Sequence, residues 1–235
     1  MKRILSTFIV FICLMMVFTG CASEAEDTLV VGMELAYPPF ETKDEQGNAT
    51  GASVDFAMEL GKYLDRPVKI ENISWDGLIP ALQTEQVDMV ISSMTIKEER
   101  LEKIDFSKPY AKALLALLVN SNSDVDAIED LNQQGKTIAV KLGSTGHIYA
   151  EKNLGKAELI TLADESACVT EVVQGKADAF IYDQLTTYRN NKANPDTTKA
   201  IYIPFQDVEY WGVGLKKGNA ELLSKINTFI DDFYA

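Results

Sequence analysis

The chain has 235 residues, 46% of them hydrophobic, which suffices for one large α/β domain or two small lobes. Its formal charge of −13, without a basic cluster, argues against nucleic acid and anionic membrane surfaces as partners. Three cysteines, of which Cys168 is expected to be small core filler, give no disulfide framework, and a single histidine without CxxC or HExxH motifs predicts no metal and no cofactor.

The first 20 residues have the features of a secretory signal peptide. A basic start precedes an apolar run over 4–18, which is shorter than the roughly 20 residues that a membrane span needs. Small residues before Cys21 resemble the lipobox of bacterial lipoproteins, in which the cysteine sulfur receives a diacylglycerol, although Phe18 replaces the usual leucine. We predict a lipoprotein signal peptide over 1–20, acyl chains such as palmitate on Cys21 and an acidic tether over 21–27. An ordinary signal peptide and an uncleaved anchor are the alternatives.

From residue 28 onward, strand and helix patterns alternate. Apolar, β-branched runs predict strands, and an apolar residue at every fourth position, as at Phe56, Leu60 and Leu64, predicts an amphipathic helix. The first set contains strands at 28–33, 68–74, 87–94 and 114–119, and helices at 53–64, 75–83 and 97–104.

A second alternating set follows the polar stretch 120–124. It contains strands at 137–141, 159–162, 177–182 and 200–204, helices from 147, at 165–174 and at 183–190, and a last strand and helix at 210–215 and 222–233. This alternation predicts parallel sheets flanked by helices, and hence two Rossmann-like α/β lobes. We predict lobe 1 over 28–119 plus 208–235, lobe 2 over 120–207, and a hinge of two crossings near residues 120 and 206–207.

Ligands of open α/β sheets bind beyond the carboxyl ends of the strands, so the residues that follow each strand are the candidates for a site. Their chemistry suits a free amino acid, which offers a carboxylate, an amine and a side chain. The candidates are Glu34, Tyr37, Trp75, Ser92, Ser93, Thr95, Arg100, Lys141, Ser144, Thr145 and Asp183.

Charged and polar candidates match the two ends of an amino acid. Arg100 offers a planar bidentate cation to a carboxylate, and Thr95 with the amides at the nearby helix start shares that charge. Asp183 and the carbonyl of Ser93 are acceptors for an amine. The alternatives are a solvated surface arginine and a helix N-cap at Asp183, and the cap can coexist with ligand binding.

The remaining candidates would form the walls of the site. Tyr37 and Trp75 present flat apolar faces, or are core aromatics, and Gly143 and Gly146 let the backbone approach a ligand closely. The two hydroxyl residues Ser144 and Thr145 are alternatively caps of the next helix.

Several motifs, taken in order over residues 28–234, resemble the solute-binding proteins of bacterial polar amino-acid ABC transporters. They are Tyr37-Pro-Pro-Phe, Trp75-Asp-Gly-Leu-Ile-Pro-Ala-Leu, Asp88-Met-Val-Ile-Ser-Ser-Met-Thr-Ile, Glu99-Arg, Asp105-Phe-Ser-Lys-Pro-Tyr, Gly143-Ser-Thr and Ala177-Asp-Ala-Phe-Ile-Tyr-Asp. The chain departs from the family at Lys97, where a threonine is common, and we expect this change to touch only the helix start.

The resemblance implies a hinged, two-lobe periplasmic-binding-protein fold of type II that works as a monomer with a membrane permease. It implies that Arg100 binds the α-carboxylate, helped by Thr95 and the backbone near Ser144 and Thr145. It also implies that Asp183 binds the amine while Tyr37 and Trp75 cover the side chain. The implied location is extracytoplasmic, on the bacterial cell membrane.

Two functions besides transport remain open on this fold. One is an amino-acid-sensing module, and the other is a cyclic amino-acid dehydratase, for which Glu34 or Lys141 would be the general acid. Within the transport function we predict a neutral polar ligand, with glutamine as the best match, because Glu34 and Lys141 would face each other and flank a carboxamide. The alternative is that these two residues only pair with each other and hold the lobes closed.

Overall fold

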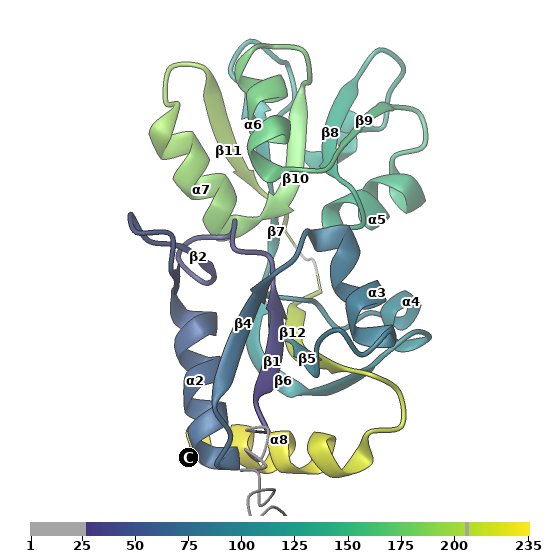
Figure 1. Ribbon diagram of the computed structural model, residues 1–235. Helices are drawn as coiled ribbons and strands as arrows, with labels where there is room; N and C mark the ends of the chain where they lie inside the picture. Colours follow the sequence, from purple (N-terminus) through teal and green to yellow (C-terminus); the bar gives the residue numbers. More distant parts are fainter. Residues whose placement is uncertain (1–26, 205–206) are drawn as a thin grey trace, which may run out of the picture.

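The computed structural model describes residues 27–204 and 207–235, and its strands form two five-stranded sheets, one in each of two lobes, and one two-stranded sheet (Figure 1). The predicted signal peptide, Cys21 and most of the tether lie outside the described residues. Among the residues that are described, no helix has the length and apolar character needed to cross a bilayer. The described residues therefore comprise almost all of the two predicted lobes.

The sheet of lobe 1 has the strand order β4-β1-β5-β12-β6. β1 (Leu29–Met33) lies parallel to β4 (Val68–Asn72) and β5 (Met89–Val90). β12 (Glu209–Leu215) runs antiparallel to both β5 and β6 (Asp105–Ala113). The chain thus returns to lobe 1 after building lobe 2, as the sequence predicts.

Both faces of this sheet are buried. Successive strand residues point to opposite faces, so Val31 packs with one cluster while its neighbour Val30 packs against another. The first cluster includes Phe56 and Phe229, whose rings lie 5.3 Å apart, and the second includes Leu78. The helical segments of lobe 1 are α2 (Ala52–Leu64), η1 (Trp75–Gly77), α3 (Leu78–Gln83), α4 (Glu98–Leu101) and α8 (Ala220–Phe233).

The sheet of lobe 2 has the strand order β11-β7-β10-β8-β9. These strands are β7 (Leu115–Asn120), β8 (Thr137–Lys141), β9 (Glu158–Leu162), β10 (Ala179–Asp183) and β11 (Thr198–Tyr202). Its helical segments are η2 (Ile128–Leu131), α5 (Thr145–Asn153), α6 (Glu165–Val173) and α7 (Gln184–Ala193). Cys168 on α6 is fully buried in the core of this lobe, as predicted, and burial raises the pKa of its thiol to about 12.

The first crossing between the lobes lies earlier than predicted. The strand predicted over 114–119 was expected in lobe 1, but β7 pairs with β10 and β11 and belongs to the second sheet. The chain crosses between Ala113, where β6 ends, and Leu115, where β7 begins. The polar stretch after Asn120 is a turn at the end of β7 rather than a hinge, because every residue of β7 is buried inside lobe 2.

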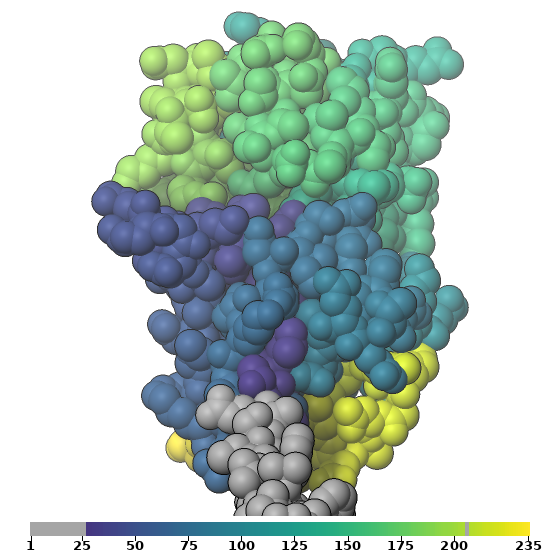
Figure 2. Space-filling view, viewed as in Figure 1, coloured from purple at the N-terminus to yellow at the C-terminus, as the bar shows by residue number. Residues whose placement is uncertain are grey.

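Three short or irregular strands were not predicted. β6 carries Pro109, which lacks a backbone donor, and the strand lies at the sheet edge where a proline is tolerated. β2 (Thr42–Lys43) and β3 (Ala49–Thr50) form a two-stranded hairpin too short for a periodic signal. The space-filling view shows atoms of this segment and of the rest of lobe 1 against those of lobe 2 (Figure 2).

Candidate functional site

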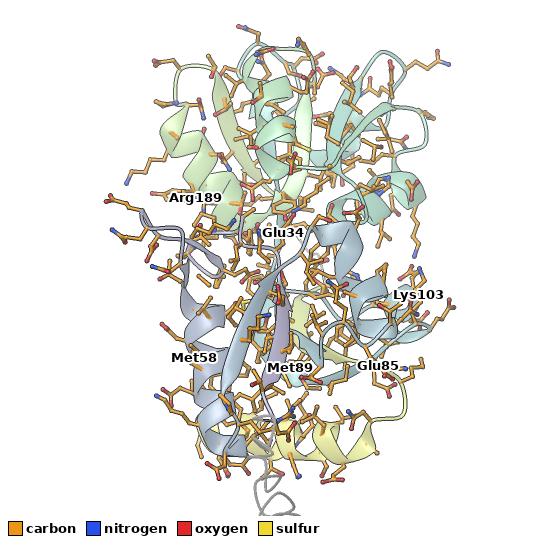
Figure 3. All side chains as sticks on the ribbon, in the orientation of Figure 1. Glu34, Met58, Glu85, Met89, Lys103 and Arg189 are labelled. Carbon is orange, nitrogen blue, oxygen red and sulfur yellow. The ribbon has the colours of Figure 1, made fainter. Side chains whose placement is uncertain are left out.

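A pocket lies between the lobes, where the carboxyl ends of strands from both sheets meet. Glu34, which follows β1, marks the level of this pocket in Figure 3. Its walls contain Glu34, Tyr37, Glu41, Trp75, Ser92, Ser93, Thr95, Arg100, Ser144, Thr145, Tyr182, Asp183, Glu209 and Trp211. All predicted candidates except Lys141 are among them, and Lys141 contacts two wall residues.

Arg100 lies at the pocket wall as a buried cation, not as a solvated surface arginine. Its Nη1 donates to the carbonyl of Thr95 at 2.7 Å, and its Nη2 donates to the carbonyl of Gly143 in lobe 2 at 3.0 Å. Burial lowers the pKa of the guanidinium to about 10, so it stays charged at neutral pH. Among the described residues, no carboxylate lies within ion-pair distance of it. A buried charge in this situation favours an anionic partner.

Asp183 ends β10 and caps α7, as one of the alternatives proposed. Its Oδ1 accepts a hydrogen bond from the amide of Thr186 at 2.9 Å. Its other oxygen, Oδ2, is buried and has no hydrogen-bond partner in the described part of the chain. A buried carboxylate oxygen without a donor is costly, so this atom is the natural acceptor for a cationic group.

Aromatic side chains from both lobes surround the pocket. Tyr37 lies edge-on to Tyr182 and to Trp211, with ring centroids 6.0 Å apart in each pair. Trp75 carries two cations near its ring, because Arg100 and the ammonium of Lys141 lie 5.1 and 5.5 Å from its centroid. The pocket therefore offers flat apolar surfaces between charged groups.

Glu34 and Lys141 face each other across the lobes, as predicted. They form an ion pair in which Lys141 Nζ donates to Glu34 Oε2, and both side chains are largely buried. The backbone amide of Glu34 also donates to Ser92 Oγ at 2.9 Å, which fixes the start of the loop after β1. This ion pair is the contact expected if Glu34 and Lys141 only pair with each other and hold the lobes closed.

Glu41 is a second acid at the pocket that sequence reasoning missed. It accepts hydrogen bonds from the hydroxyls of Ser93 at 3.0 Å and Ser92 at 3.5 Å, and burial raises its pKa to about 8. Ser93 adopts φ 47°, a left-handed conformation that turns the chain sharply after β5. Glu41 directly follows the Tyr37-Pro-Pro-Phe motif, and this position was its only sequence signal.

The start of α5 forms the lobe 2 wall opposite Arg100. Ser144 caps the helix by accepting from the amide of His147 at 3.2 Å, which confirms the capping alternative. Gly143 has φ +69°, which side chains rarely adopt, and close approach of its backbone to a ligand stays a prediction. For Gly146 the structure shows a packing reason, since a Cβ there would lie 2.1 Å from the carbonyl oxygen of Ile181 on β10, and its approach to a ligand stays a prediction.

Glu209, the first residue of β12, was also missed. Its Oε2 accepts from the hydroxyls of Thr145 at 2.9 Å and of Thr95 at 3.3 Å. Its Oε1 lies 3.4 Å from the ammonium of Lys97, so the family departure at that position reaches the pocket rather than only the helix start. The sequence did not reveal Glu209 and Trp211 as site residues, because only the return of the chain to lobe 1 brings them to the pocket.

Two α/β lobes that enclose a pocket at their strand ends define the class of two-lobe binding proteins with the type II periplasmic fold. The family described as "Bacterial extracellular solute-binding proteins, family 3" matches residues 29–235, and the chain belongs to this family. The resemblance found in the sequence motifs is thereby confirmed.

Named relatives bind different amino acids. The L-cystine-binding protein TcyJ of Escherichia coli (strain K12) is 33% identical over 205 residues, which cover 86% of this chain and 76% of that protein. A solved ancestral arginine-binding protein bound to glutamine matches with TM-score 0.80 and 36% identity, over 88% of this chain and 92% of the other. The ancestral amino acid-binding protein AncCDT-1, a precursor of cyclohexadienyl dehydratase, matches with TM-score 0.80 and 37% identity over 88% and 89%.

Proposed function

We propose that this protein captures a free amino acid outside the cytoplasm and delivers it, as a monomer, to the permease of an ABC importer. The extracellular family and the amino acids named for its relatives support this proposal. The observation that carries it is that Arg100 and Asp183 both line one pocket. Within the described residues, the guanidinium of Arg100 donates its hydrogen bonds to two carbonyls, and Oδ2 of Asp183 has no hydrogen-bond partner. A zwitterion supplies an anionic and a cationic group for these two positions.

Closure of the lobes is the motion that would admit and trap the ligand. The chain crosses between the sheets near Leu114 and again between β11 and β12, where residue 206 of the predicted crossing lies outside the described residues, and two crossings between lobes support a hinge. Small-angle scattering should show a smaller radius of gyration at saturating ligand than in a sample verified to be free of it. An unchanged radius would contradict hinge closure.

Glutamine is the ligand that we propose for the pocket. The acid of Glu34 and the ammonium of Lys141 flank one side of the site, and a carboxamide offers donor hydrogens to the first and an acceptor oxygen to the second. A strongly cationic side chain would meet the charge of Lys141, and like charges in a desolvated site are costly.

A thermal-shift screen of the mature protein against the common amino acids and cystine tests both parts of this proposal. A ligand that binds only the folded state at 100 times its Kd adds about 2.7 kcal/mol to the free energy of unfolding. We expect glutamine to give the largest shift. Tight binding of arginine with none of glutamine would contradict the ligand assignment, and no shift with any amino acid would contradict the function.

L-Cystine is a second candidate ligand because a relative is named for it and because it carries two amino-acid head groups. The second head has its own carboxylate and ammonium, which match Lys141 and Glu34 respectively. Cystathionine, which also has two heads but lacks the disulfide, separates the two ligands. It should bind if a second head is recognised and fail if the site is made for a carboxamide.

We propose a binding role rather than a dehydratase reaction. The neighbour described as a precursor of a dehydratase is itself called an amino acid-binding protein, and Glu34, a candidate acid, is held in an ion pair with Lys141. Incubation with prephenate or arogenate should yield no aromatic product. Product formation that disappears in a Glu34→Gln variant would favour the enzyme.

We also propose that Cys21 carries the lipid anchor, on the evidence of the lipobox-like stretch after the apolar run. Cys21→Ser should release the protein from membranes or leave it unprocessed. A variant with a cleaved N-terminus that still partitions into the detergent phase would refute lipidation at this residue.

A further inference from the structure

We propose that Glu209 is an internal carboxylate that competes with the ligand at the Arg100 end of the pocket. The hydroxyl groups of Thr95 and Thr145 donate to Glu209, and an incoming amino acid must replace Glu209 as their hydrogen-bond acceptor. The inference rests on the proposed function, because that end of the pocket is the one assigned to the α-carboxylate of the ligand.

The hydrogen bonds of Glu209 span the two lobes. A single atom, Oε2, accepts from Thr95 in lobe 1 at 3.3 Å and from Thr145 in lobe 2 at 2.9 Å. The Glu209 residue is 6% exposed, so these contacts are shielded from water. A hydroxyl has one hydrogen to donate, and a hydroxyl that donates to Glu209 cannot donate to a ligand carboxylate at the same time.

Lys97 allows an acid to reside at this anion-binding end. Its ammonium lies 3.4 Å from Glu209 Oε1, and it is the more exposed partner of the pair. Arg100 is directed elsewhere, since its two terminal nitrogens donate to the carbonyls of Thr95 and Gly143. The internal acid therefore occupies the hydroxyl donors without hydrogen-bonding Arg100, although its charge favours the charged form of that guanidinium.

Competition of this kind limits affinity and favours release. A ligand carboxylate gains the two hydroxyl donors only as Glu209 loses them, so part of its binding energy is spent on exchange. The negative charge of Glu209 also repels a ligand carboxylate, and Lys97 reduces this repulsion. Removing the charge of Glu209 should tighten binding, whereas removing the charge of Lys97 should weaken it.

The test compares Glu209→Gln with the matched control Glu99→Gln. Glu99 also bridges the lobes, through Lys152, but its ion pair is exposed and outside the pocket wall. Affinities for L-glutamine, L-arginine and L-cystine are measured by calorimetry on the native protein and both variants. For every ligand that the native protein binds, we expect about tenfold tighter binding in Glu209→Gln and a change of less than about twofold in Glu99→Gln.

Lys97→Met supplies a second test that does not alter a buried residue. It leaves the charge of Glu209 uncompensated, and we expect binding about three- to tenfold weaker, opposite in sign to the effect of Glu209→Gln. Unchanged or weaker binding in a folded Glu209→Gln variant would overturn this inference but leave the proposed function intact. If the native protein bound none of the three ligands, the proposed function would fall and this inference with it.

Discussion

Two glutamates of lobe 1 border the same pocket and differ in their partners. Glu34 is paired with Lys141 from lobe 2, and their side chains are 13% and 3% exposed. Glu41 is 1% exposed and is held by the hydroxyls of Ser92 and Ser93, so burial raises its pKa to about 8. A cation from the other lobe thus contacts Glu34, whereas hydroxyl groups alone do not offset the burial of Glu41.

A third acid shows what exposure changes. Glu99 also pairs with a lysine of lobe 2, Lys152, but these side chains are 45% and 63% exposed. Solvent screens such a pair, and exposed pairs contribute about 0–1 kcal/mol. Contacts that join the same two lobes should therefore differ widely in energetic weight, and the following variants test that ranking.

The largest expected effect is on stability and concerns Glu41. Its folded-state pKa is raised above the ordinary value of 4.5, so its contribution is fully present below that value and is lost as pH rises through about 8. The free energy of unfolding should fall between pH 5 and 8 by about 3.5 kcal/mol more in the native protein than in Glu41→Gln. Denaturant titrations across this range give the difference, and parallel pH profiles would show that Glu41 is ionised in the folded protein.

Arg100 is the cationic counterpart of Glu41, buried among carbonyls without an acidic partner at ion-pair distance in the described chain. If it receives the α-carboxylate, Arg100→Ala should weaken ligand binding by roughly 2–5 kcal/mol, which is about 30-fold or more. Arg100→Lys should recover only part of this loss, because an ammonium cannot reproduce the bidentate fork. Near-native affinity of Arg100→Ala in calorimetry would show that the site is assigned wrongly.

Lys141→Ala breaks the buried pair and separates the two roles considered for it. If Lys141 contacts the ligand side chain, glutamine affinity should fall about tenfold while arginine affinity holds or improves, since a repelling charge is gone. Competition titrations with both ligands measure this selectivity. A uniform loss for all ligands would instead assign Lys141 to holding the lobes together.

The smallest effect is expected at the exposed pair. Lys152→Ala should change ligand affinity by less than about twofold and the free energy of unfolding by less than about 1 kcal/mol. Calorimetry and denaturant titration at low and at high salt give both values. A loss of ligand affinity as large as that of Lys141→Ala would mean that the burial of an ion pair does not determine how much the pair contributes.

Local patterns predicted most of the fold and the part of the site that follows individual strands. Period and composition located the strand before Glu34 and the helix that Asp183 caps, because these signals lie within a few residues of one another. The first crossing was misplaced because the buried strand β7 has no mark that assigns it to one sheet or the other. Glu41, Tyr182, Glu209 and Trp211 were missed because their place in the pocket depends on tertiary contacts, and a buried tryptophan alone is indistinguishable from core.

The buried thiol of Cys168 has a practical consequence for measuring this protein in solution. A form that begins at Ala22 contains no other cysteine, and a thiol with a pKa of about 12 hardly ionises at neutral pH and stays unreactive. A cysteine placed at Leu142, which is exposed and lines a groove beside Trp75 and Arg100, would then be the single site for a fluorescent label. Such a label lies where the lobes meet, so its emission would turn the protein into an optical sensor for its own ligand.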